Sequence, residues 1–227
     1  MMYHQIPIPP RSEHLWRYTP WHRIHPSKPD VIPSADGIVF KTQDNVSLIE
    51  TSSREPTSSE IARTFLHECE GSSYNLSLDN ITEPIHINAR CSGHVSVGSL
   101  NVEVKGSAVL FIHLTGEPEW AGIHITGTVH PNSQLFYGFI NELDSNAKFL
   151  RCEDWKLQRD ASMENATLSL GGFRCKTDIR SSLNGTGASL RQAITVNANG
   201  AQHDDEHVEI HHHHGHTYSD LVMNSAC

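Results

Sequence analysis

The chain has 227 residues, of which 37% are hydrophobic, so one large domain with an appendage fits better than two full domains, and a wholly disordered chain is excluded. Lys and Arg number 17 against 26 Asp and Glu, which gives a formal net charge of −9. This balance argues against a nucleic-acid-binding protein, because such a protein needs a dense cationic surface. No apolar run approaches the ~20 residues that span a bilayer, and the start lacks the pattern of a secretory signal, so we expect a cytoplasmic protein that does not contact membranes.

Five cysteines are scattered along the chain and form no C-x-x-C pair, so the sequence indicates neither a disulfide framework nor a zinc ribbon. We expect most of them to be small buried apolar residues. Histidine is the unusual component, because its 17 residues equal Lys and Arg together.

The first 35 residues hold seven of the eleven prolines, which excludes a long helix or a central strand and indicates an extended segment. Residues 16–21, WRYTPW, contain three aromatic side chains. We expect this stretch to pack on the body of the protein through Trp16 and Tyr18, because clustered exposed aromatic side chains would form an aggregation or binding patch.

Two local elements are expected before residue 72. The first is a short strand pair at 38–40 and 46–49, joined by a polar turn at 43–45. The second is a helix over 58–70, which begins with a possible capping box between Thr57 and Glu60 and places four apolar residues on one face.

From about residue 72 the pattern changes to short alternating runs rich in β-branched residues and bounded by Gly, Asn, Asp or Ser. Two all-β architectures suit such runs: an antiparallel sandwich or barrel, and a parallel β-helix of stacked coils. The scarcity of two-residue hairpin turns slightly favours the β-helix. We therefore expect an N-terminal cap over 1–71, with an extended segment and one helix, and a β core over 72–227.

Residues 200–220 contain seven histidines and five carboxylates. Neutral imidazole and carboxylate are common ligands for zinc, iron, nickel and copper, and residues two apart on a strand share a face. We take His203, Asp205, His212 and His216 as candidate metal ligands. The competing interpretation is that each histidine is an ordinary solvated or hydrogen-bonded strand residue.

No catalytic constellation is present: the sequence has no G-x-S-x-G, no H-E-x-x-H and no cysteine in a recognisable activating context. The run Asn184-Gly185-Thr186-Gly187 lacks the Lys-Ser/Thr of a phosphate-binding loop, so we expect a turn between coils there. Composition and spacing therefore predict only a cytoplasmic β-rich protein with a His-rich C-terminal region.

Three segments in the same order resemble the SufB/SufD family of iron–sulfur cluster assembly proteins. The first, Arg11-x-Glu13-x-x-Trp16-Arg17-Tyr18-Thr19-Pro20, is similar to a motif near the start of SufD-type members. The other two are Asp178-x-Arg180 with Leu183-x-Gly185-x-Gly187-Ala188, and Gln202-His203-x-Asp205 followed by His212, His216-Thr217 and Ser219.

The resemblance implies a right-handed parallel β-helix with a small extended or helical N-terminal cap. It also implies a scaffold component of the SUF machinery that acts with a SufC-type ATPase and a SufB-type partner, or as a homodimer. The resemblance further implies that the chain is not an enzyme, because family members are not known for a turnover reaction of their own. The cofactor would be at most a transient iron–sulfur cluster.

The chain departs from the family pattern in two ways. Gly215 replaces the proline of the P-H-T motif, and Glu206 stands where a histidine is usual. Family chains also continue past this point to a helical segment that docks on the ATPase, so the resemblance implies either a fragment or a shortened, SufD-like member. Two other hypotheses remain: a His-rich metal-dependent enzyme or metal-storage protein on a closed β-barrel, and a purely structural β-solenoid.

Overall fold

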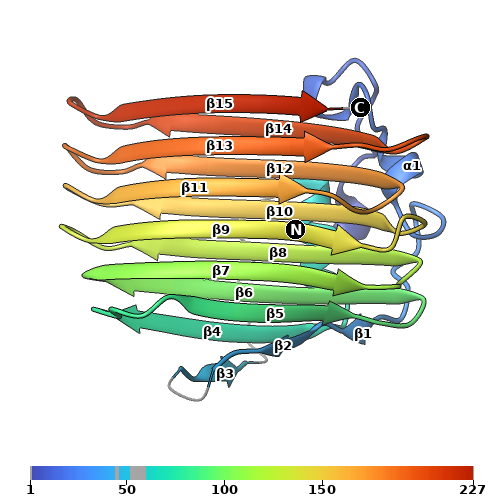
Figure 1. Ribbon diagram of the computed structural model, residues 1–227. Helices are drawn as coiled ribbons and strands as arrows, with labels where there is room; N and C mark the ends of the chain where they lie inside the picture. The colour runs from blue at the N-terminus through green and yellow to red at the C-terminus, as the bar shows by residue number, and fades with distance from the viewer. Residues whose placement is uncertain (1, 44–45, 52–59, 227) are drawn as a thin grey trace.

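The computed structural model describes residues 2–43, 46–51 and 60–226. The chain forms a parallel β-solenoid of about six turns, in which each turn contributes one strand to each of two facing sheets (Figure 1). Sheet A has the order β14 (His203–His212), β12 (Arg174–Leu183), β10 (Lys148–Leu157), β8 (Trp120–Val129), β6 (Val95–Lys105), β4 (Ser72–Asp79) and β3 (Leu48–Glu50), with β1 (Asp36–Gly37) beside β6. Sheet B has the order β15 (Tyr218–Ala226), β13 (Ser189–Asn197), β11 (Ser162–Ser169), β9 (Gln134–Leu143), β7 (Ser107–Gly116), β5 (Ile85–Cys91) and β2 (Val39–Lys41).

The pairing direction separates the two architectures that the sequence left open. All neighbours within each sheet from β4 to β15 pair in parallel. Within the described residues, only the pairs β2–β5 and β3–β4 are antiparallel. The parallel β-helix prediction is confirmed, and the antiparallel alternatives are wrong.

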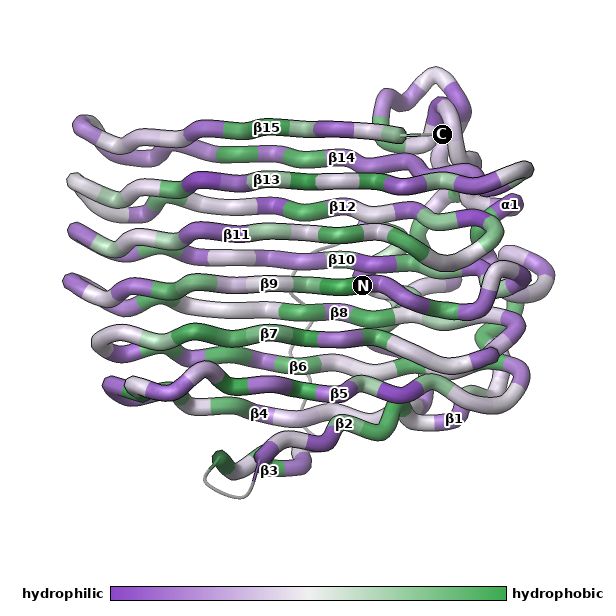
Figure 2. Tube along the Cα trace, viewed as in Figure 1, coloured by the Kyte–Doolittle hydropathy of each residue, from purple (hydrophilic) through white to green (hydrophobic). Residues whose placement is uncertain are grey.

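The core lies between the two sheets, because each strand alternates buried and exposed positions. In β5, for example, Ile85, Ile87, Ala89 and Cys91 are buried while the residues between them are exposed. The hydropathy trace shows this alternation along the strands, with hydrophilic residues gathered at the turns (Figure 2). The strand period of two therefore sorts the side chains between lumen and surface.

One turn position recurs in all six coils, where the chain passes from sheet A to sheet B. It has a positive φ each time, and consecutive occurrences are 26 to 29 residues apart: Asn80, Gly106, Asn132, Asp160, Gly187 and His216. Gly tolerates this left-handed conformation best, and Asn, Asp and His adopt it more often than other residues. A Cβ at Gly187 would lie 2.1 Å from the Oδ1 atom of Asp160 in the preceding coil. The expected turn at 184–187 is therefore confirmed.

The N-terminal segment and the main helix cover the outer face of sheet A. The segment contains η1 (Tyr3–Gln5), η2 (His14–Trp16) and α1 (Trp21–Ile24), and α2 (Ile61–Glu68) follows β3. Trp16, Trp21 and Phe65 are fully buried in one aromatic cluster. The indole Nε1 of Trp120, on β8, donates to the Ile24 carbonyl at 2.6 Å and fixes the cluster on the sheet.

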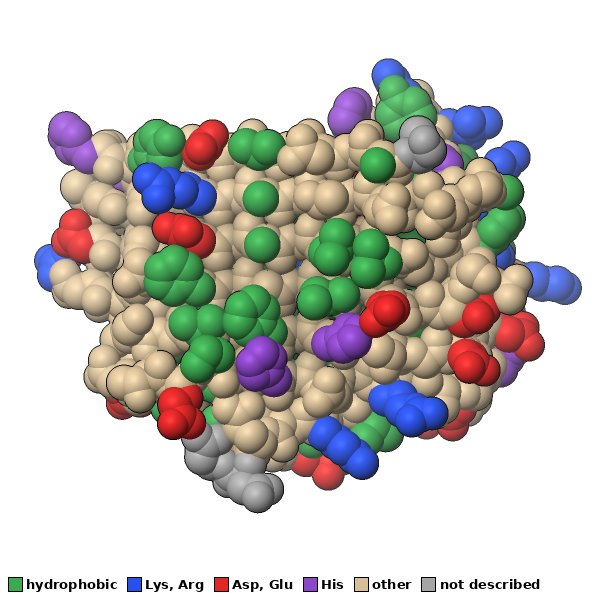
Figure 3. All heavy atoms as spheres, in the orientation of Figure 1, with side chains coloured by type: hydrophobic (Ala, Val, Ile, Leu, Met, Phe, Trp, Pro, Cys, Tyr) green, Lys and Arg blue, Asp and Glu red, His purple; other side chains and the backbone are tan. Residues whose placement is uncertain are grey.

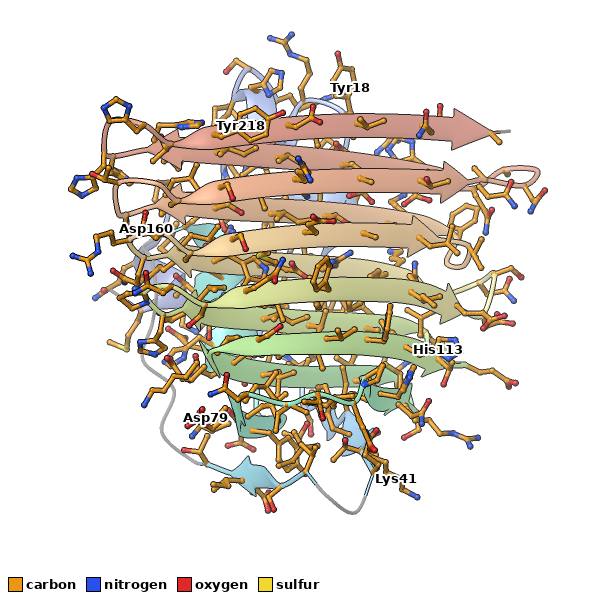
Figure 4. All side chains as sticks on the ribbon, turned by 60° about the vertical axis from the view of Figure 1, so that its left-hand side comes forward. Tyr18, Lys41, Asp79, His113, Asp160 and Tyr218 are labelled. Atoms are coloured by element: carbon orange, nitrogen blue, oxygen red, sulfur yellow. The ribbon has the colours of Figure 1, made fainter. Side chains whose placement is uncertain are left out.

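Three local expectations need correction. Tyr18 is 63% exposed and points away from the strands, so it does not anchor the segment (Figure 4). The strands at 39–41 and 48–50 do not pair with each other, because each joins a different sheet. Helix α2 is shorter than expected and its N-cap is Glu60, whose carboxylate accepts from the backbone N–H groups of Ala62 and Arg63. Thr57 and residues 44–45 of the expected turn lie outside the described residues.

No helix among the described residues is long and apolar enough to cross a membrane.

Trp16 and Tyr18 provide a matched pair for testing how the segment is held. We expect Trp16→Ala to lower the free energy of unfolding by about 3 kcal/mol, because a buried indole leaves a cavity, and Tyr18→Ala to change it by less than about 0.5 kcal/mol. Urea denaturation of both variants measures this. Equal effects of the two substitutions would contradict the packing described here.

Candidate functional site

The four candidate metal ligands lie in two separate places. His203 and Asp205 are at the start of β14, whereas His212 ends the same strand and His216 lies in the following turn. His203 and His212 are nine residues apart on one strand, which corresponds to about 30 Å. Within the described residues, no group of three or more His, Cys, Asp or Glu side chains is arranged to hold a metal ion.

At the first place, the polar side chains hold the N-terminal segment. The Nε2 atom of His203 lies 2.9 Å from the Thr19 hydroxyl. Asp205 pairs with the buried Lys176 ammonium at 3.0 Å, and this ammonium lies 5.9 Å from the centre of the Trp16 ring. Burial, together with the charge of nearby Arg174, lowers the pKa of His203. Two motifs that are about 180 residues apart in the sequence thus meet in space, Trp16 to Thr19 and His203 to Asp205.

At the second place, the histidines belong to the last turn. The two ring nitrogens of His212 lie 2.7 Å from the Thr217 hydroxyl and 3.0 Å from the Ser219 hydroxyl. His216 occupies the positive-φ position of this turn, with φ 58. Thr217 also donates to the His214 carbonyl at 3.1 Å. These contacts give His212 and His216 a role in closing the turn.

A buried charge cluster lies on the outer face of sheet A. Arg63, on α2, is 1% exposed. Its Nε atom donates to both carboxylate oxygens of Asp154, at 2.8 and 3.0 Å, and its Nη1 atom donates to the carboxylate of Asp178. Its Nη2 atom donates to the carbonyls of Glu153 and Asp178 at 3.1 and 3.3 Å. One guanidinium therefore joins the helix to two successive coils.

Histidines complete this cluster on both sides. The Nε2 atom of His124 lies 2.8 Å from Asp154, and the Nδ1 atom of His207 lies 2.9 Å from Asp178. Burial alone would raise the pKa of Asp154, but His124 and Arg63 lower it to about 2. In the same way, His207 and Arg63 outweigh burial and hold the pKa of Asp178 well below its usual value. Both carboxylates are therefore ionised at neutral pH.

A second polar cluster lies inside the solenoid. The fully buried Glu153 carboxylate accepts from the guanidinium of Arg151 at 2.6 and 2.8 Å, from the Tyr137 hydroxyl at 2.7 Å and from the Trp155 indole at 2.8 Å. The guanidinium also lies 3.7 Å from the centre of the Phe139 ring. These contacts give the buried charge pair the hydrogen bonds that it needs in a low-dielectric interior.

One lumen carboxylate is not satisfied in this way. Burial raises the pKa of Glu206 to about 7, despite the nearby positive charge of Arg151. Its Oε2 atom is buried and has no hydrogen-bond partner. The same is true of the side-chain amide atoms of Asn165 and Gln192, which occupy aligned positions on neighbouring strands. The lumen therefore contains polar atoms that the protein itself does not satisfy.

The described cysteines do not form a cluster-binding set. Cys69, Cys91, Cys152 and Cys175 are buried, as the sequence predicted, and form no disulfide with one another. Burial raises the pKa of Cys91 to about 12 and raises those of Cys152 and Cys175 as well. Burial therefore keeps the thiols of Cys91, Cys152 and Cys175 protonated at neutral pH.

Sequence reasoning missed Arg63, Asp154 and Glu153. The helical pattern gave no sign that Arg63 is buried, because a residue two positions after Ile61 and two before Phe65 lies away from their apolar face. The run Arg151-Cys152-Glu153-Asp154-Trp155 placed charges at consecutive strand positions, so at least one had to face the lumen. That signal did not identify the partner residue.

Arg63 is the residue whose loss we expect to damage the fold most. Arg63→Met leaves Asp154 and Asp178 buried without their shared partner and should lower the free energy of unfolding by about 3 to 5 kcal/mol. Amide hydrogen exchange should show α2 opening before the strands. The control is Arg90→Met on an exposed position of β5. Equal stability of the two variants would show that the cluster does not hold the helix.

Glu206 should make stability depend on pH. Because its pKa is higher in the folded chain than its ordinary 4.5, the free energy of unfolding should fall as pH rises from about 4.5 to about 7 and then level off. Glu206→Gln removes this loss, so at pH 8 the variant should be more stable than the parent by about 2 kcal/mol. Thermal melts from pH 4 to pH 8 measure it, with the exposed Glu83→Gln as control. Parallel pH profiles of parent and Glu206→Gln would refute the assignment.

Comparison with known families supports the resemblance seen in the sequence. The family described as SUF system FeS cluster assembly, SufBD core domain, matches residues 85–227, which run from β5 to the end of the chain. Neither the curated proteins nor the solved structures contain a match to the chain. The family match covers more than half of the chain and coincides with the parallel solenoid. The chain therefore belongs to the SufBD core-domain family, which acts in iron–sulfur cluster assembly by the SUF system.

Proposed function

We propose that the chain is a scaffold component of the SUF machinery in the cytoplasm, and that it acts with a SufC-type ATPase and a SufB-type partner or a second copy of itself. It catalyses no turnover reaction of its own, and the iron–sulfur cluster is its transient cargo. The observation that carries this proposal is the SufBD family match over residues 85–227.

Exposed apolar side chains on β15 support the proposal that the chain binds a partner protein. Leu221 and Met223 occupy positions that face the lumen in the preceding coil, yet they are 40% and 50% exposed. Val208 and Ile210 on β14 are partly buried and pack against the core. Exposed apolar side chains that lie close together favour contact with a partner.

Among the described residues, no group of three or more His, Cys, Asp or Glu side chains is arranged to hold a metal ion. We propose that cluster ligands come from the assembled complex. The chain's contribution is then a rigid surface, fixed by the Arg63 cluster on one face and by the stacked lumen inside.

Complex formation tests this function. The chain is co-expressed with SufB-type and SufC-type proteins of its own organism, and the mass of the product is measured by size-exclusion chromatography with light scattering. We expect one stable complex that contains the chain. The double substitution Leu221→Glu with Met223→Glu should abolish it, whereas Ile49→Glu, an exposed residue on β3, should not.

Two results would contradict the proposal. One is the absence of any complex with either protein. The other is a complex that forms equally well with the Leu221→Glu and Met223→Glu substitutions, which would show that the last coil is not the partner surface.

A further inference from the structure

The two faces of the solenoid differ in what covers them. Helices α1 and α2 pack against strands of sheet A. The outer face of sheet B carries exposed hydrophobic side chains across its middle, and the space-filling view shows these side chains at the surface (Figure 3). Phe111 and Phe136 are 38% and 37% exposed, and Val222 is 49% exposed. Soluble proteins seldom expose contiguous apolar surface unless it binds something.

A groove of about 390 Å³ lies in this face. Strand register places Ala166 on β11 directly beside Ala193 on β13, and these two short side chains form the floor. Phe111 and Phe136 form one wall and Val222 the opposite one. The strand axes that carry Phe136 and Val222 are three strand spacings apart, or about 14 Å, and β7 with Phe111 lies one spacing farther. This width is comparable to the 10–12 Å diameter of an α-helix with its side chains.

Charged residues line one rim of the groove. Glu164, Arg191 and Asp220 lie side by side on β11, β13 and β15. Arg191 pairs with Glu164 at 3.3 Å. Two carboxylates and one guanidinium leave the rim with a net negative charge. The whole chain carries −9, so a second copy would bring like charge to this face, whereas a basic partner would be attracted.

Sheet A already binds an amphipathic helix on its outer face. Helix α2 lays Ile61, Phe65 and Leu66 on sheet A and extends Arg63 to the carboxylates of Asp154 and Asp178. We propose that the groove on sheet B docks an amphipathic helix of a partner protein, with an apolar face over Ala166 and Ala193 and a Lys or Arg that pairs with Asp220. This docking goes beyond the proposed scaffold function and does not depend on it, since it uses the middle of sheet B rather than the lumen of the last coil.

Binding of a designed helix tests the proposal. The probe is a fluorescent 18-residue peptide with Leu and Ala on one helical face and Lys on the other, and fluorescence anisotropy measures its dissociation constant with the full chain. We expect Ala193→Trp, which fills the groove without changing the charge, to weaken binding about tenfold. Asp220→Lys should weaken it about threefold to tenfold.

The controls separate groove binding from general attraction to an acidic protein. Ala201→Trp and Glu83→Lys make the same chemical changes at exposed positions away from the groove, so binding should stay within about twofold of the parent. A peptide of the same composition in scrambled order should bind at least about tenfold more weakly, because it has no apolar face. Circular dichroism confirms that each variant is folded.

Three results would overturn the proposal. They are equal binding of the scrambled peptide, equal binding by Ala193→Trp and the parent, and no binding of the amphipathic peptide. Sedimentation adds a further outcome: a dimer that Ala193→Trp converts to a monomer would show that the face pairs two copies of the chain instead.

Discussion

The parallel register between successive coils is the constraint on which the structure depends. Because each strand from β4 to β14 in sheet A aligns with the next, residues about 27 positions apart in the sequence become neighbours. Ser99, His124, Cys152, Asp178 and His207 occupy one such row on the outer face. A turn residue with a positive φ recurs in every coil and maintains this register. The register thus decides which charges meet, although no single coil contains the whole set.

Arg63 uses this register to attach the N-terminal part of the chain. A buried guanidinium is costly to desolvate, and the cost is offset only because carboxylates from two coils and two backbone carbonyls surround it. The helix that carries Arg63 therefore fits at one position on the stack. The aromatic cluster around Trp16 and Trp21 packs beside it and gives the segment its apolar contact.

The sequence predicted the strands because alternation is a local property, whereas the parallel solenoid was favoured by the scarcity of hairpin turns and by the family resemblance. Each strand shows its period of two within a few residues. A turn glycine such as Gly187 indicates a left-handed backbone conformation whatever the rest of the chain is. Which strands pair and which side chains are buried depends on residues far apart in the sequence. The sequence could not tell that β2 joins β5 instead of β3, or that Tyr18 is exposed while Trp16 is buried. The candidate ligands His203 and His212 lie at opposite ends of the ten-residue strand β14.

The SufBD family match coincides with a solenoid that has one face covered by the N-terminal helices and one face with exposed apolar side chains. The most direct test of its place in the SUF system is genetic. The coding sequence is deleted in the native host, and the activity of a [4Fe–4S] dehydratase is measured together with the amount of its polypeptide. The account predicts a loss of activity at unchanged polypeptide level, with recovery on re-expression of the chain. Full activity in the deletion strain, under conditions in which the SUF system is the one in use, would contradict it.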